Sequence, residues 1–169
     1  MSESALSPTF RLVRFLVIGA VVGFLVAAGA LGAFHCDEAN VVRHVTRFAD
    51  GDWGRPGRPG FLWLLLSPSL LFDSPVASVL AMRAAAVGGS LGTLALVWRI
   101  VQDDDPDDRI GPLLAVALLG ASMSWQAHSF EVRTDTFVVP MTLLAGWAVV
   151  RPSVTFRQAL LAGLALGAA

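Results

Sequence analysis

The feature that most constrains this chain is a series of long apolar runs separated by short polar segments. More than half of its 169 residues are hydrophobic and only 15% are charged, whereas ordinary soluble domains carry about 25% charged residues. The first run, residues 15–34, is long enough to cross a bilayer, and it exceeds the apolar core of a cleavable signal peptide. The sequence therefore predicts an all-α integral membrane protein of the cell membrane with multiple spans.

The apolar runs predict four complete transmembrane helices and the beginning of a fifth. A helix of about 20 residues is needed to span a bilayer, and the last run is too short to do so. The short last run predicts that residues 1–169 are the N-terminal part of a larger membrane protein. A C-terminal remainder or a second subunit would complete this protein. The expected complete helices are 15–34, 76–101, 110–125 and 136–150, and the incomplete one is 159–169.

The first polar segment, residues 35–59, predicts a short amphipathic helix on the membrane surface. Val41, Val45 and Phe48 recur at helical spacing, while polar side chains occupy another face. Counting spans alternately then places this segment and residues 126–135 on one side of the membrane. The N-terminus and residues 102–109 fall on the other side.

Two groups of charged residues on that shared side are candidates for chemistry. Asp37 and Glu38 follow the first apolar run, where carboxylates are costly unless water, a partner or a substrate is present. Equally, Asp37 is suited to the first turn of the surface helix. Glu131, Arg133 and Asp135 precede the fourth predicted helix, and Asp135 is a good helix N-cap.

Other motifs are less specific. Arg55 and Arg58 lie in a proline- and glycine-rich turn that suits either a phosphate group or a plain surface loop. The acidic run 103–108 contains the DDxxD spacing of prenyltransferases, but Pro106 interrupts a helix there, which favours a solvated connector. His35, His44 and His128 match no compact metal-ligand spacing, so we assign no metal residues. A net charge of −1 gives no reason to expect nucleic acid binding.

Two stretches in this order resemble the GT-C membrane glycosyltransferases, a superfamily that includes protein O-mannosyltransferases and aminoarabinose transferases. The first runs from His35-Cys36-Asp37-Glu38 to Arg58-Pro59-Gly60-Phe61, and resembles the family's first outer loop. The second, Ser129-Phe130-Glu131-Val132-Arg133-Thr134-Asp135, is similar to the family's Arg-x-Asp motif before helix four. Each motif is weak, and the ordered pair is more specific.

The resemblance implies inverting transfer of a sugar from a polyprenyl-phosphate donor to an acceptor hydroxyl at the outer membrane face. Asp37 would be the general base, with Glu38 supporting it and Asp135 as the second acid. Arg133 and Arg58 would bind the lipid phosphate, with Glu131 beside them in the substrate site. No cofactor is firmly implied, and a divalent metal requirement stays open. The alternatives are a non-catalytic multi-span protein, such as a transporter or assembly piece, and a DDxxD-type prenyltransferase.

Overall fold

Helices make up every regular element that the computed structural model describes. Two of them are long: α1, Pro8–Leu31, and α4, Pro75–Asp104. The all-α fold expected from the sequence is therefore confirmed. The structure describes residues 7–32, 40, 43–45, 47, 50, 71–128, 132, 135–150 and 155–168.

Helices α1 and α4 have 24 and 30 residues, and both are long and apolar enough to cross a membrane. The Ser7 hydroxyl begins α1 by accepting a hydrogen bond from the Phe10 N–H at 3.2 Å, with a proline at the start of the helix. The sequence placed this helix at residues 15–34, starting after Arg14. It starts earlier because Arg14 is accommodated within the helix, stacked on Trp98.

The prediction of four complete spans is wrong for the described residues. Beyond α1 and α4, the helices with fully described bounds are α5, Gly111–Ala121; α6, Met123–His128; α7, Asp135–Val150; and α8, Phe156–Ala168. The longest of these, α7, has 16 residues and is about 24 Å long, against a hydrocarbon core of about 30 Å. Within the described ranges, only α1 and α4 meet the length and apolarity expected of a span.

The predicted third helix, residues 110–125, is interrupted at Ser122. This residue has extended backbone angles, φ −65° and ψ 120°, and its hydroxyl accepts from the Trp125 N–H at 3.5 Å. The Gln126 side-chain amide donates to the Gly120 carbonyl at 2.8 Å, which satisfies a carbonyl at the end of α5. Serine competes with the helix backbone in this way, so one apolar run becomes α5 and α6.

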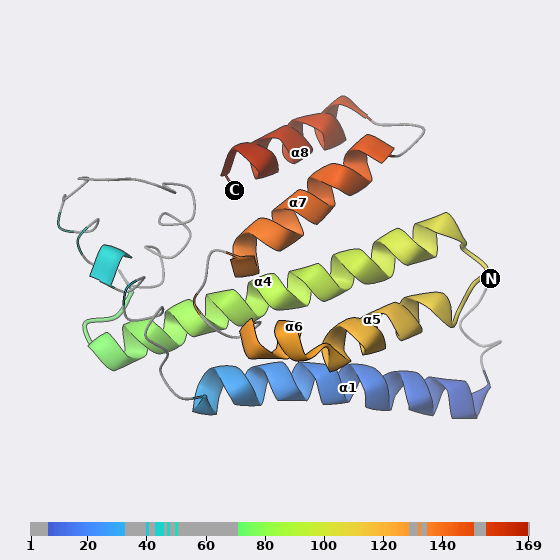
Figure 1. The fold of residues 1–169 in the computed structure, drawn as a ribbon, viewed down its shortest axis with the longest axis horizontal. Coiled ribbons are helices and arrows are strands. Elements are labelled where there is room, and N and C mark those ends of the chain that lie inside the picture. Colours follow the sequence, from blue (N-terminus) through green and yellow to red (C-terminus); the bar gives the residue numbers. More distant parts are fainter. Residues whose placement is uncertain are drawn as a thin grey trace.

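The helices form an uneven bundle around α4 (Figure 1). Helix α1 runs antiparallel to α4, α5 packs against both, α7 packs on α4, and α8 packs on α7. A cluster of buried apolar side chains joins α1, α4 and α5. Its buried members are Leu25, Val87, Leu94 and Val116.

Much of the apolar surface of the two long helices is left uncovered. In the most apolar 18-residue stretch of α1, only 11% of the residues are buried, and in the corresponding stretch of α4 28% are buried. Phe15 and Leu31 of α1 and Val76 of α4 are among the exposed large side chains. Apolar surface on this scale marks contact with lipid or with another protein.

A fragment of the predicted surface helix lies within the described residues. Residues 43–45 and 47 are helical, Val45 is fully buried, and Arg43, His44 and Arg47 are exposed. Val45 is buried within the protein, so its burial does not test the predicted contact of an apolar face with a membrane. Contact of this helix with a membrane stays a prediction, and Val41 and Phe48 lie outside the described residues.

Helix α7 comes very close to α4 at Gly89. A Cβ atom added to this glycine would lie 2.6 Å from the Thr136 carbonyl oxygen, so only glycine permits this approach of the two backbones. Thr136 is itself buried, and the Thr93 hydroxyl donates to the Gly89 carbonyl at 3.1 Å. Small and hydroxyl-bearing residues of this kind are typical where membrane helices pack closely.

We expect Gly89→Ala to destabilise the protein by about 1–3 kcal/mol because the added methyl group overpacks the contact with α7. Gly88→Ala is the matched control, since nothing lies within 4 Å of a Cβ at that position. It should be neutral or stabilising by up to about 1 kcal/mol, through helix propensity. Unfolding of the purified variants in detergent, followed by circular dichroism, measures both. Equal stability of the two variants would contradict the close contact.

Candidate functional site

Most of the predicted site residues lie outside the described residues. The exception is Asp135, which is the first residue of α7. This position is next to the N-cap position expected from the sequence. The side chain of Asp135 is outside the described part of the structure. The structure therefore does not test the proposed roles of these side chains. Those outside the described residues are Asp37, Glu38, Arg58, Glu131 and Arg133.

The described residues do show where the flanking helices end. Near the start of α4, the Arg83 guanidinium donates to the Gly32 carbonyl at 2.7 Å. Gly32 is the C-cap of α1, five residues before Asp37. A cation at a helix C-terminus satisfies a free carbonyl and is favoured by the helix dipole. Arg83 is only 4% exposed, so this contact fixes the end of α1 against α4 from within the bundle.

The start of α7 lies against the middle of α4. Thr136, the residue after Asp135, approaches Gly89, and Gly89 lies six residues beyond Arg83. Six residues correspond to about 9 Å along a helix. The α1 C-terminus and the α7 N-terminus are therefore fixed to nearby levels of one helix (Figure 1). Each is directly connected to one of the two predicted acidic groups.

Two carboxylates of the acidic run at the other end of α4 are engaged in local structure. Asp105 Oδ1 accepts from the backbone N–H groups of Asp107 and Asp108, at 3.1 and 3.3 Å. Asp108 Oδ1 accepts from those of Ile110 and Gly111, both at 2.9 Å. The bonds from Gly111 and Ile110 lower the pKa of the Asp108 carboxyl below its ordinary value. These acids thus form a turn and cap α5, as expected for a connector.

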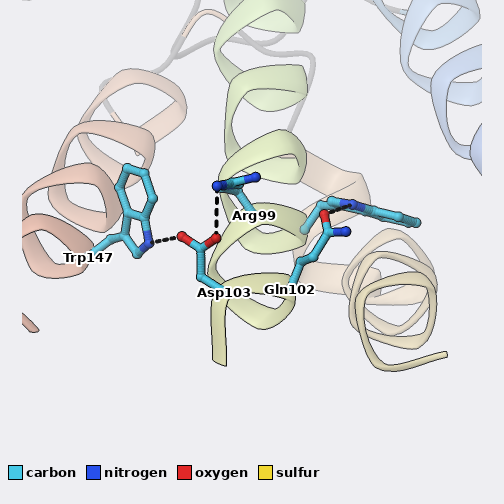
Figure 2. Close-up of polar contacts among 5 residues, drawn as sticks. Arg99, Gln102, Asp103 and Trp147 are labelled. Carbon is cyan, nitrogen blue, oxygen red and sulfur yellow. Dashed lines mark hydrogen bonds and ion pairs between the residues drawn. The ribbon is translucent and has the colours of Figure 1, made fainter. Parts of the chain in front are cut away.

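The remaining acids of this run include Asp103, which connects α4 to α7. Its Oδ1 lies 3.0 Å from Arg99 Nη2, and its Oδ2 accepts from the Trp147 indole N–H at 3.2 Å. Figure 2 shows Trp147 approaching Asp103 from α7, with Arg99 on the same helix as the carboxylate. This end of the bundle therefore has its own polar cluster, far along α4 from Arg83.

A second polar contact at this end joins α1 to α4. The Arg14 guanidinium carbon lies 4.9 Å from the centroid of the Trp98 ring, a cation–π distance. The Trp98 indole N–H donates to Gln102 Oε1 at 3.1 Å. Arg14, Trp98, Arg99 and Gln102 also line a groove between α1, α4 and α5, with a volume of about 490 Å³.

Sequence reasoning noted the arginines and Trp98 but missed these partners. Arg83 and Arg14 both interrupt apolar runs, and an arginine inside such a run indicates a specific partner. Neither partner could be identified from spacing, because Gly32 is 51 residues from Arg83 and Trp98 is 84 from Arg14. Among the described residues, no three His, Cys, Asp or Glu side chains are grouped to hold a metal ion.

Comparisons of the chain with models of known protein families, with curated proteins and with solved structures find no match.

We expect Arg83→Met to destabilise the protein by about 1.5–3 kcal/mol, because a charge-assisted hydrogen bond is lost and the Gly32 carbonyl is left without it. Arg83→Lys, which keeps the charge but not the planar guanidinium, should lose less. Denaturant unfolding in detergent provides the comparison. If Arg83→Met is as stable as the wild type, Arg83 does not hold the end of α1.

Proposed function

We propose that this chain belongs to a membrane glycosyltransferase that moves a sugar from a polyprenyl-phosphate donor to an acceptor hydroxyl at the outer membrane face. The observation that carries the proposal is the attachment of the α1 C-terminus and the α7 N-terminus to nearby levels of α4. The two acidic motifs that resemble the GT-C family follow the first of these ends and precede the second. Asp37 and Glu131 are 94 residues apart in the sequence. Their motifs thus adjoin helix ends that contact α4 at levels about 9 Å apart.

Membrane insertion is supported by the uncovered apolar surface of α1 and α4. In water, exposure of Phe15, Leu31 and Val76 would be unfavourable, whereas acyl chains would cover them at no cost. The shorter helices α5, α7 and α8 pack against this pair or against each other. We infer that they lie within or beside the bilayer through those contacts.

The arginines of the two sides are equal in number, and the first helix favours one orientation. Arg11 and Arg14 lie near the N-terminal end of α1, and arginines that flank the first span favour the cytoplasmic side. The opposite end, where Arg83 contacts Gly32, then faces outward. A lipid-linked donor in the outer leaflet and a water-soluble acceptor would both reach the segments attached there.

The proposed reaction needs a base, an acid partner and a site for the leaving phosphate. Asp37 takes the proton of the acceptor hydroxyl as its oxygen attacks the anomeric carbon, with Glu38 supporting Asp37. The bond from that carbon to the donor phosphate oxygen breaks, and configuration inverts. Arg133 and Arg58 stabilise the charge that develops on the lipid phosphate. Glu131 and Asp135 complete the site, and the requirement for a divalent metal stays open.

The DDxxD alternative gains no support from the acidic run. Asp105 and Asp108 are engaged by backbone N–H groups, and Asp103 is engaged by Arg99 and Trp147. Helix capping and a connection between helices account for these carboxylates without a diphosphate ligand. The non-catalytic alternative is separated from transfer by the following experiment.

We expect Asp37→Asn to lower sugar transfer by the full-length protein in lipid nanodiscs at least about 100-fold, the usual contribution of a general base. The assay supplies a radiolabelled polyprenyl-phosphate sugar and measures transfer to acceptor. Asp50→Asn is the matched control, because it makes the same change at an exposed position of the same polar segment. Near-normal transfer by Asp37→Asn would contradict the assignment of the base, and absence of transfer by the wild type would favour the non-catalytic alternative.

A further inference from the structure

The groove between α1, α4 and α5 has an apolar wall and a cationic end. Its volume of about 490 Å³ is within the range of small-molecule sites. The lining contains two arginines and no acidic residue. The apolar part is formed by aliphatic side chains, including Ile18, Val21, Val22, Leu91, Leu94 and Val116.

The polar groups are concentrated at one end of the groove. Arg14 of α1 and Arg99 and Gln102 of α4 all lie toward the helix ends that meet there. Arg14 is held over the Trp98 ring, and Arg99 is paired with Asp103. The Gln102 amide oxygen accepts a hydrogen bond from the Trp98 indole N–H. The Gln102 side chain therefore offers a ligand its amide NH2 group as a donor.

The groove changes from polar to apolar along α1 in the same order as a membrane lipid changes from headgroup to acyl chain. Arg14 is six residues from the start of α1, about 9 Å along the helix, which is within reach of the interface for a long side chain. From Arg14 to Val22 the lining becomes aliphatic over a further 12 Å or so. A headgroup at the arginines would thus direct its acyl chain toward the middle of the membrane.

We propose that this groove binds an anionic membrane lipid, with the phosphate at Arg14 and Arg99 and one acyl chain along the aliphatic wall. Charge complementarity selects the class of ligand, because the Arg14 guanidinium, with Arg99 as a second donor that also pairs with Asp103, favours a phosphate oxygen. The site is at the opposite end of α4 from Arg83, so it is separate from the proposed transfer site. It depends on membrane insertion and not on the transfer chemistry.

The test is native mass spectrometry of the full chain in detergent, titrated with phosphatidylglycerol or with phosphatidylcholine that carries the same acyl chains. We expect phosphatidylglycerol to bind about tenfold more tightly, and Arg14→Gln to remove most of that preference. Arg11→Gln is the matched control, because Arg11 is exposed on the same helix and does not line the groove. Equal loss in both arginine variants would overturn the proposal, since it would indicate nonspecific attraction.

A second pair of variants tests the acyl-chain part of the groove without changing charge. Ala95 lines the groove, whereas Ala84 is exposed on α4 outside it. We expect Ala95→Phe to weaken phosphatidylglycerol binding about tenfold by filling the groove, and Ala84→Phe to leave it unchanged. Equal binding by the two variants would contradict occupation of the groove. Arg14→Gln decides the question if Ala95→Phe fails to fold.

A competition experiment separates a lipid from a free phosphate. Inorganic phosphate at a concentration equal to that of the lipid should not displace phosphatidylglycerol, because it lacks the acyl chain that contacts the apolar wall. Displacement by phosphate alone would show that the arginines bind the headgroup without the chain, and the lipid assignment would then be wrong.

Discussion

The hydrogen bond from Arg83 to the Gly32 carbonyl is the interaction on which the arrangement of this protein depends. A guanidinium inside an apolar helix is unfavourable unless a specific acceptor is present, and the end of α1 supplies one at 2.7 Å. The contact satisfies a helix terminus, neutralises part of its dipole and fixes the exit of α1 beside the start of α4. Gly89 then determines where α7 begins, because only a residue without a side chain lets the Thr136 backbone approach so closely. Through these two contacts, the segments that carry the predicted acidic motifs adjoin helix ends that contact α4 near its start and at its middle, about 9 Å apart.

The two ends of α4 differ in their chemistry. At the start, a buried arginine serves a backbone carbonyl. At the far end, Arg99, Asp103 and Trp147 connect α4 to α7 (Figure 2). Arg14 of α1 stacks on Trp98 of α4. Asp105 and Asp108 are engaged in a turn and in the cap of α5. Structural roles therefore account for Asp103, Asp105 and Asp108 at the far end. The groove proposed for an anionic lipid lies at this end, away from the proposed transfer site.

Local sequence patterns were sufficient to predict the helices, but not their lengths. The apolar runs correctly predicted α1, α4 and α7, and Asp135 marks the start of α7 as expected of a helix-start residue. The run 110–125 gave no sign of a break, because Ser122 is a single weak signal whose effect depends on capping Trp125. The partners of Arg83 and Arg14 depend on tertiary packing between distant segments, which no spacing rule contains. The roles of Asp37, Glu38, Arg58, Glu131 and Arg133 stay predictions from the family resemblance.

Sided labelling of cysteine tests most directly whether the two ends of α4 face opposite sides of a membrane. Cys36 is the only cysteine of the chain and lies four residues beyond Gly32, whereas Asp107 is in the connector at the far end. In intact cells, a membrane-impermeant maleimide should label Cys36. The Cys36→Ser/Asp107→Cys variant should be labelled only after the cells are permeabilised. Labelling of both positions from the same side, or in the reverse order, would contradict an outward-facing transfer site.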